Sequence, residues 1–171
     1  MDGFLIGRFQ PFHLGHMNAV DFALTKVNQL FIGIGSSNKS NQIRNPFTAK
    51  ERAQMITLSL NESQKTRIKL YEIPDVNNHE KWVSCIAEIV PNFDVLFTND
   101  STTANIYTTR NMSVITIDMV ARPKLSGTNI RNLILQRGNW VNLVPLGTQD
   151  VLKRIDAQER IRLINDNFDI V

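Results

Sequence analysis

Two histidines and an arginine are crowded into the first sixteen residues, in the stretch MDGFLIGRFQPFHLGH. If residues 3–7 form a strand and a helix begins near Leu14, His13 and His16 lie three residues apart and can face one object. The start of a helix presents unpaired N–H groups and the positive end of its dipole, which together favour an anion. We therefore predict a phosphate site at Arg8, His13 and His16, where Gly15 lets a ligand approach the backbone.

Two other interpretations of the histidine pair stay open at this point. In the first, the two histidines are half of a zinc site. Zinc needs a third protein ligand, and the only other histidine and cysteine of the chain are His79 and Cys85. The second alternative is a pair of surface histidines without a role. Their position at the end of the first predicted strand makes phosphate binding the favoured interpretation.

A second candidate for anion binding lies far along the chain, in the stretch KLSGTNIRNLI. Ser126 and Thr128 lie at a predicted helix start, and Arg131 falls in the first turns of that helix. The helix dipole disfavours a cation there unless an anion lies against it, although an ordinary surface ion pair is the alternative. Arg44 lies in a long loop after the second apolar run, and such loops in compact domains are usually functional.

Five short apolar runs have the composition of strands, at residues 3–7, 29–35, 67–73, 94–98 and 113–117. Segments with helical spacing or composition separate them, which predicts a parallel sheet covered by helices. Ligands of such sheets bind at the carboxyl ends of the strands near the switch in strand order. We therefore expect the chemistry in the loops that follow the first, second and fourth runs.

The helical segments carry apolar stripes. The three clearest stripes are Met17, Val20, Ala23, Leu24 and Val27; Ala53, Met55, Ile56, Leu58 and Leu60; and Trp82, Val83, Ile86, Ile89 and Val90. A capping box formed by Thr48 and Glu51 precedes the second stripe, and Pro91 ends the third. After residue 125 we predict a helix from Ser126 to about Leu135 and two short amphipathic pieces near 148–156 and 158–165.

The bulk composition predicts one soluble domain over residues 1–171, divided into a sheet core at 1–125 and a helical part at 126–171. The chain is 42% hydrophobic, and its net charge of +3 is dispersed, so neither a nucleic-acid partner nor a membrane is expected. A single cysteine and the lack of a signal-peptide pattern favour a cytoplasmic location. GIGSSN lacks the third glycine of a dinucleotide fingerprint, and no P-loop pattern is present.

GRFQPFHLGH followed by LSGTNIR resembles the paired signature of nucleotidyltransferases that carry an early HxGH motif and a late SxTxxR motif. Within them, the chain is most similar to the archaeal-type nicotinamide-nucleotide adenylyltransferases. SSNKSNQIRNPFTAKER, PDVNNHEKWVS and WVNLVP extend the resemblance nearly from end to end. It implies a Rossmann-like sheet of five parallel strands with helices on both faces and a small helical C-terminal part.

The resemblance also implies an activity: ATP and nicotinamide mononucleotide (NMN) give NAD and pyrophosphate, with Mg²⁺ carried by ATP and no metal ligand from the protein. His13 and His16 would contact the phosphates around the α-phosphorus, Arg8 and Arg131 would hold the triphosphate, and Arg44 would contact phosphate. The implied ATP-binding residues are Gly7, Arg8, Phe9, His13, Gly15, His16, Ser126, Thr128 and Arg131. Asp75 and Trp82 would receive the nicotinamide, and the family favours a homo-oligomer.

Two segments depart from the family pattern. His79 stands where the family commonly has asparagine, and Thr98, Asn99 and Asp100 replace a Gly-Asn-Pro turn. Trp82 has an alternative interpretation as a core aromatic, and Asp75 with Glu80 as a solvated pair or an acid/base pair. No serine or cysteine stands beside a base in the sequence, which favours direct in-line attack. Alternative functions are the same chemistry on pantetheine phosphate or FMN, and a nucleotide sensor without turnover.

Overall fold

The structure, a computed structural model, describes residues 1–76, 78–117 and 124–168. Its sheet has the order β3-β2-β1-β4-β5, and every pairing is parallel. The strands are β1 (Asp2–Gly7), β2 (Gln29–Ile34), β3 (Ile68–Glu72), β4 (Val95–Thr98) and β5 (Ser113–Thr116). The five predicted strands are confirmed to within one residue at each end. The strand order reverses between β1 and β4, so a ligand site is expected at their carboxyl ends.

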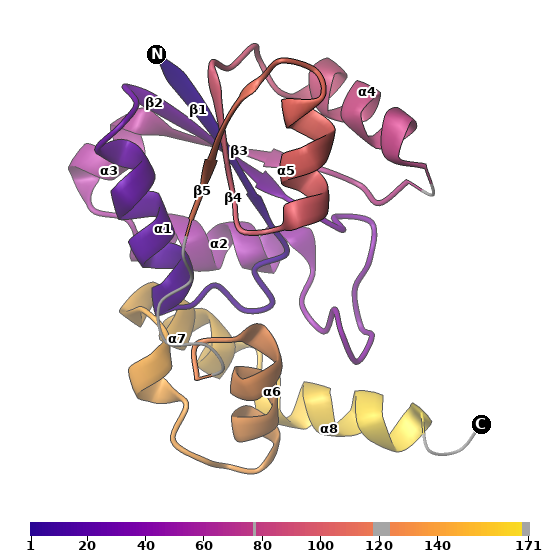
Figure 1. Cartoon of the computed structure of the whole chain (residues 1–171). Coiled ribbons are helices and arrows are strands. Elements are labelled where there is room, and N and C mark those ends of the chain that lie inside the picture. Colours follow the sequence, from indigo (N-terminus) through magenta and orange to yellow (C-terminus); the bar gives the residue numbers. More distant parts are fainter. Residues whose placement is uncertain (77, 118–123, 169–171) are drawn as a thin grey trace.

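Helices cover both faces of the sheet (Figure 1). On one face, α1 (Leu14–Leu24) and α2 (Ala49–Ser59) pack on strand residues such as Leu5 and Ile32. On the other, α4 (His79–Ile89) and α5 (Ser101–Thr108) pack on residues such as Phe4 and Leu96. Successive residues of a strand, such as Phe4 and Leu5, thus face opposite sides of the sheet and belong to different hydrophobic clusters, as expected for a pleated strand. The short α3 (Glu62–Arg67), which was not predicted, leads into β3.

The predicted capping box of α2 is confirmed, because Thr48 and Glu51 exchange hydrogen bonds with each other's backbone N–H groups. The predicted apolar face of this helix is partly wrong, since Leu58 is 52% exposed. The buried side chains of α2 are Ala49, Arg52, Met55 and Ile56. Leu58 lies roughly 120° around the helix from Arg52 and so points away from the core.

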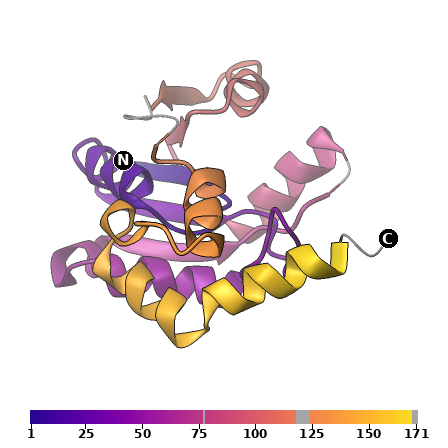
Figure 2. The same cartoon turned by 90° about the horizontal axis from the view of Figure 1, so that it is seen from below.

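The C-terminal helices lie beyond the carboxyl ends of the strands (Figures 1 and 2). They are α6 (Gly127–Leu135), the 3₁₀ turn η1 (Val141–Leu143), α7 (Leu146–Arg154) and α8 (Ala157–Phe168). The predicted cap at Ser126 and both later helical pieces are confirmed. Ile130, Val151 and Ile161 belong to the same hydrophobic cluster as α1 and α2, so these helices are packed on the sheet core.

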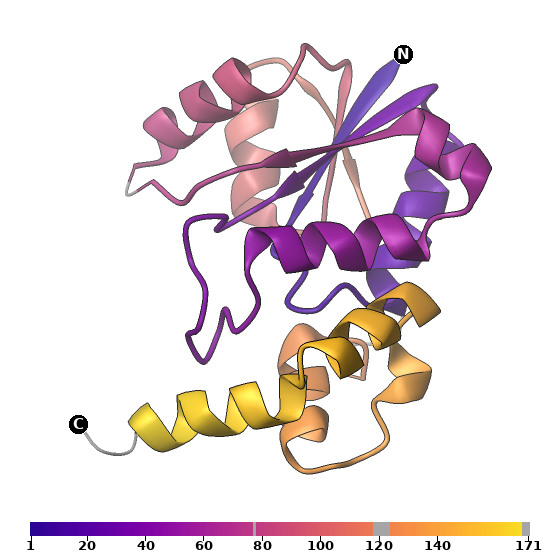
Figure 3. The ribbon, with the colours of Figure 1, turned by 180° about the vertical axis from the view of Figure 1, so that it is seen from behind.

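Helix α7 lies directly against α2, as Figure 3 shows from behind. A Cβ atom on Gly147 would overlap the backbone of Leu58, so this close approach requires glycine. Two polar contacts reinforce the packing: Arg154 donates to Gln54 at 2.7 Å, and Arg160 of α8 pairs with Glu51 at 2.7 Å. No helix in the described ranges is long and apolar enough to cross a membrane.

Candidate active site

The two histidines of the first loop cap their own helix. His13 is the N-cap of α1, and its Nδ1 accepts from His16 N at 3.3 Å, while Nδ1 of His16 accepts from His13 N at 3.2 Å. The rings stack with centroids 3.6 Å apart, as expected for side chains that face one object. Because each Nδ1 acts as an acceptor, a neutral ring carries its proton on Nε2. In each ring, Nδ1 is thus taken up by the main chain and Nε2–H is the donor that can bind a ligand.

Aromatic neighbours fix the orientation of the pair. The ring of His16 meets Phe9 edge-on at 4.8 Å and stacks on Phe12 at 5.7 Å. His13 is only 2% exposed. Packing and main-chain hydrogen bonds thus hold both rings, and few rotamers remain open to them.

The histidines line a cavity of about 420 Å³ between the carboxyl ends of β1 and β4 and the start of α6. We call it the first cavity. It brings together eight of the predicted site residues: Gly7, Arg8, Phe9, His13, His16, Ser126, Thr128 and Arg131. Gly15 is buried in α1 and is not among the lining residues, so its predicted role stays a prediction.

Arg131 reaches back from α6 to the first loop. Its guanidinium donates to the main-chain oxygen of Gln10 at 2.8 Å and to Oγ1 of Thr128 at 3.3 Å. Burial, together with repulsion from Arg8 and Arg44, lowers the pKa of Arg131 to about 10. Within the described ranges, none of these three arginines has a carboxylate within 4.0 Å. Arginines that repel one another and have no carboxylate partner are suited to bind a highly charged anion, so the predicted phosphate contacts stay a prediction that this arrangement favours.

A second cavity, of about 990 Å³, lies between the loop after β2 and helix α8. Arg8, Lys39 and Arg44 supply its positive charge, and Ile164 and Asn167 of α8 form part of its wall. Arg8 lines both this cavity and the first one. The predicted phosphate contacts Arg8 and Arg44 therefore lie in one continuous cationic region.

A third cavity, of about 520 Å³, contains both residues predicted to receive a nicotinamide, Asp75 and Trp82. Trp82 also packs against the hydrophobic cluster that contains Phe4 and Leu96. This packing supports the interpretation as a core aromatic, and the contact with nicotinamide stays a prediction. Asp75 lines the second cavity as well as the third. The three cavities thus adjoin in series, joined first by Arg8 and then by Asp75.

Asp75 is held as a carboxylate. Burial alone would raise its pKa, but hydrogen bonds from Lys39 Nζ at 2.7 Å and Ser36 Oγ at 2.9 Å hold the pKa below its ordinary value. Glu80 is exposed and lies outside the lining of the third cavity. An acid/base pair of Asp75 and Glu80 is therefore not supported.

The departures from the family pattern lie at the edges of these cavities. Thr98 and Asn99 line the first cavity, whereas Asp100 lines the third and caps α5 by accepting from Thr103 N at 2.7 Å. Residues 98–100 thus connect the first cavity with the third. Residue 77 and the side chain of His79 lie outside the described part of the chain.

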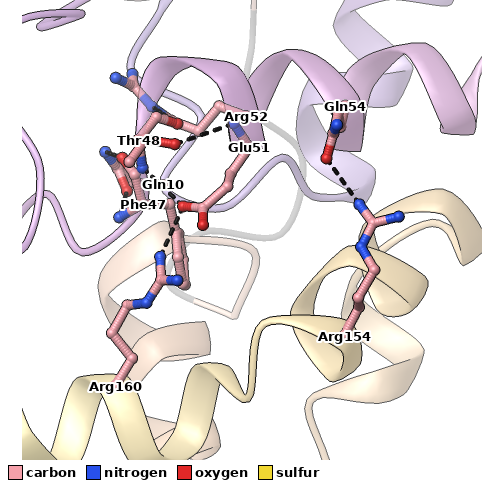
Figure 4. Close-up of polar contacts among 8 residues, drawn as sticks. All are labelled: Gln10, Phe47, Thr48, Glu51, Arg52, Gln54, Arg154 and Arg160. Atoms are coloured by element: carbon pink, nitrogen blue, oxygen red, sulfur yellow. Dashed lines mark hydrogen bonds and ion pairs between the residues drawn. The ribbon is translucent and has the colours of Figure 1, made fainter.

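Sequence reasoning missed two buried polar residues that join the loops of the site, Gln10 and Arg52. The side chain of Gln10 donates to Phe47 O at 2.9 Å and accepts from Phe47 N at 3.0 Å. Arg52 is 0% exposed and extends from α2 (Figure 4). Its guanidinium donates to main-chain oxygens of the first loop and of the loop after β2. Burial lowers the pKa of Arg52 to about 10. One signal in the sequence could have revealed Arg52: it lies three and four residues before Met55 and Ile56, and so on the buried face of α2.

The donor set of the first cavity does not fit a divalent cation held by the protein. Its described lining contains no aspartate or glutamate, and hard cations such as Mg²⁺ prefer carboxylate oxygens. Within the described ranges, no group of three or more His, Cys, Asp or Glu side chains is placed to hold a metal ion. The zinc interpretation of His13 and His16 is therefore not supported.

Comparison with known proteins agrees with this geometry. Residues 4–133 match the cytidylyltransferase-like family, which defines the class of the protein. The chain is 37% identical over 98% of its length to a nicotinamide-nucleotide adenylyltransferase of Pyrococcus furiosus, and covers 90% of that protein. It is 40% identical over 95% of its length to the enzyme of the same name from Thermoplasma volcanium, 91% of which it covers. The chain thus belongs to the nicotinamide-nucleotide adenylyltransferase family.

Solved structures share the fold. A bifunctional NMN adenylyltransferase/ADP ribose pyrophosphatase from Francisella tularensis, complexed with AMP and a manganese ion, superposes with a TM-score of 0.80 at 21% identity. The match covers 99% of this chain and 53% of the bifunctional protein, so the chain spans about half of its length. Nicotinic acid mononucleotide adenylyltransferase of Plasmodium falciparum, at 11% identity, gives a TM-score of 0.64 over 92% of this chain and 96% of that one. The predicted α/β fold is confirmed.

Proposed function

We propose that the protein transfers the adenylyl group of ATP to NMN and forms NAD and pyrophosphate. The observation that carries this proposal is the series of three cavities. The His13/His16 pair and Arg131 line the first, a cationic second cavity adjoins it, and Trp82 with Asp75 lines the third. A dinucleotide product has this order of parts: one nucleoside, a charged bridge and a second nucleoside.

In this assignment the first cavity takes the adenosine side of ATP. The Nε2–H groups of His13 and His16 donate to the α-phosphate, and Arg8, Arg44 and Arg131 neutralise the other two phosphates. Mg²⁺ enters with ATP as part of the substrate. Trp82 stacks on the nicotinamide ring, and the ionised Asp75 accepts from its carboxamide.

The mechanism follows from the groups that line the first cavity. Ser126 Oγ accepts from Asn129 N, and Thr128 Oγ1 accepts from Arg131. Within the described residues, neither hydroxyl donates a hydrogen bond to a base. The NMN phosphate is already ionised at neutral pH and needs no general base. Its oxygen forms the bond to the α-phosphorus while the bond to the bridging oxygen breaks and pyrophosphate departs. The protein contributes positioning and charge neutralisation, with each preorganised donor contributing roughly 3 kcal/mol.

A direct assay tests the proposal. The protein is incubated with ATP, Mg²⁺ and, separately, NMN, nicotinic acid mononucleotide, pantetheine phosphate and FMN, and pyrophosphate and the adenylylated product are quantified. We expect NAD and equimolar pyrophosphate with NMN. Turnover with pantetheine phosphate or FMN alone would assign another acceptor, and ATP binding without turnover would favour a sensor.

The family also supports a homo-oligomer and a cytoplasmic location, which we include in the proposal. Light scattering of the purified full chain measures the oligomeric state. A mass equal to one chain of 19.5 kDa would contradict the homo-oligomer.

A further inference from the structure

Arg52 touches none of the three cavities, yet it is the largest wholly buried polar side chain of the described ranges. All its side-chain hydrogen bonds go to main-chain oxygens: to Arg8 at 2.7 Å, to Gly35 at 2.6 Å, to Ser36 at 3.1 Å and to Thr48 of its own helix at 3.2 Å. Within the described ranges, no carboxylate lies within 4.0 Å of it. Arg52 is thus a buried cation that binds two separate loops, one at Arg8 and the other at residues 35 and 36.

Both loops turn sharply beside the oxygens that Arg52 binds. Phe9, which follows Arg8, has φ of 51°, and Ser36 has φ of 50°. Non-glycine residues rarely adopt this left-handed region, and such turns persist only where the surrounding structure holds them. Gly35 N donates to Gly7 O at 2.9 Å, so the two turns also lie against each other. One guanidinium therefore holds two strained turns side by side.

Each of these turns carries a group of the proposed site. Arg8 projects from the first turn and joins the first and second cavities. Ser36 projects from the second turn, and its hydroxyl donates to Asp75, which joins the second and third cavities. The hydrogen bonds of Arg52 thus connect the turn that carries Arg8 with the turn whose Ser36 binds Asp75.

Stability alone does not account for an arginine at this position. Taking a cation out of water is costly, and an apolar side chain of similar volume commonly stabilises a buried position equally well or better. A planar guanidinium, in contrast, binds several oxygens in a fixed relative geometry, which the point charge of lysine does not reproduce. An arginine is therefore the residue expected at position 52 if the turns at Arg8 and Ser36 must be held in a fixed relative geometry.

We propose that Arg52 is a positioning residue that sets the separation between the ATP phosphate subsite and the mononucleotide subsite by holding the turns at Arg8 and Ser36. The inference rests on the proposed function. It assigns Arg52 a role in both substrate affinities and in turnover, although Arg52 contacts neither substrate.

The test compares Arg52→Lys and Arg52→Met with Arg154→Lys and Arg154→Met. Arg154 is a matched control because it also bonds to α2, through Gln54, but lines none of the cavities. The measurements are Tm, kcat, the KM values of ATP and NMN, and ATP affinity by calorimetry. We expect both Arg52 variants to raise both KM values and to lower kcat/KM by roughly 100-fold, the scale of a 1 Å misplacement. The Arg154 variants should match wild type in kcat and KM.

Chemical rescue separates positioning from folding. Methylguanidinium should raise the activity of Arg52→Ala at least roughly tenfold, because it refills the space of the missing guanidinium. It should not change the activity of wild type or of Arg154→Ala. Wild-type KM values in Arg52→Lys and Arg52→Met, even with a lowered Tm, would overturn the inference, as would the absence of rescue in folded Arg52→Ala. If wild type forms no NAD, the proposed function fails, and unchanged calorimetric ATP affinity in Arg52→Lys would then overturn this inference separately.

Discussion

The two ends of the proposed cleft are held in different ways. At the phosphate end, His13, Gln10 and Arg52 are buried and bond to main-chain groups. At the nicotinamide end, Asp75 is 37% exposed in its side chain and is held by the partly exposed Lys39 and by Ser36. In the proposed assignment, the end where bonds are made and broken is thus the more deeply buried, while the recognition end also depends on a contact nearer to solvent, that of Lys39 with Asp75.

His16→Ala should have the largest effect. It removes the Nε2–H donor that the account places on the α-phosphate, so kcat should fall at least roughly 100-fold while ATP affinity changes little. His16→Asn is the matched variant, because its side-chain oxygen can still accept from His13 N and maintain the cap. Steady-state kinetics of both variants check the prediction. A raised KM for ATP with an unchanged kcat would contradict the role given to His16.

Arg131→Ala should weaken ATP binding by roughly 10- to 100-fold, because charge-assisted hydrogen bonds to the triphosphate are lost. NMN affinity should stay near wild type, since Arg131 lines only the first of the three cavities. Arg110→Ala is the control, because it removes a cation that follows α5 and lines none of the three cavities. Calorimetry with ATP measures the difference, and equal affinities in both variants would remove Arg131 from the site.

Trp82→Ala should act at the other end, with a KM for NMN raised by about tenfold and little change for ATP, because a stacking surface is lost. Trp82→Phe keeps an aromatic ring and should retain most of the affinity. Initial rates at varied NMN check this pair. If Trp82→Phe and Trp82→Ala lose the same affinity for NMN, stacking is not the role of Trp82.

The smallest expected effect concerns stability. Burial raises the pKa of Glu51, but hydrogen bonds from Arg160 and Thr48 outweigh it and hold the pKa below its ordinary value. A carboxylate with a lowered pKa stabilises the fold above its ordinary pKa, and this contribution is lost as the pH falls through the lowered value. Arg160→Met should therefore lower Tm by about 2–4 °C at pH 7 and by less at about pH 3. A difference in Tm that is equal at both pH values would contradict the assignment.

The strands were predictable because parallel strands buried on both faces appear in sequence as nearly continuous apolar runs. His13 and His16 were also predictable as a pair, since their spacing is local and follows from helix geometry. The capping by their own Nδ1 atoms was not, because histidine is not among the residues that normally cap helices. Local spacing therefore gave the position of the pair but not the tautomer that its hydrogen bonds select.

Arg52 and Gln10 were missed for a different reason. Their partners are main-chain oxygens and nitrogens up to 44 residues away, and any sequence supplies such groups everywhere along the chain. A stripe built from apolar residues alone placed Leu58 on the buried face of α2 and left out Arg52. Only the tertiary fold shows that the cation, rather than the leucine, lies in the core.

The stereochemical course at the α-phosphorus distinguishes direct in-line attack from a mechanism with a covalent intermediate. In direct in-line attack, NMN and the departing pyrophosphate lie on opposite sides of the α-phosphorus, with no covalent intermediate. ATP that is chiral at the α-phosphorus should therefore give NAD with inverted configuration. Retained configuration, which requires two successive displacements, would contradict direct in-line attack.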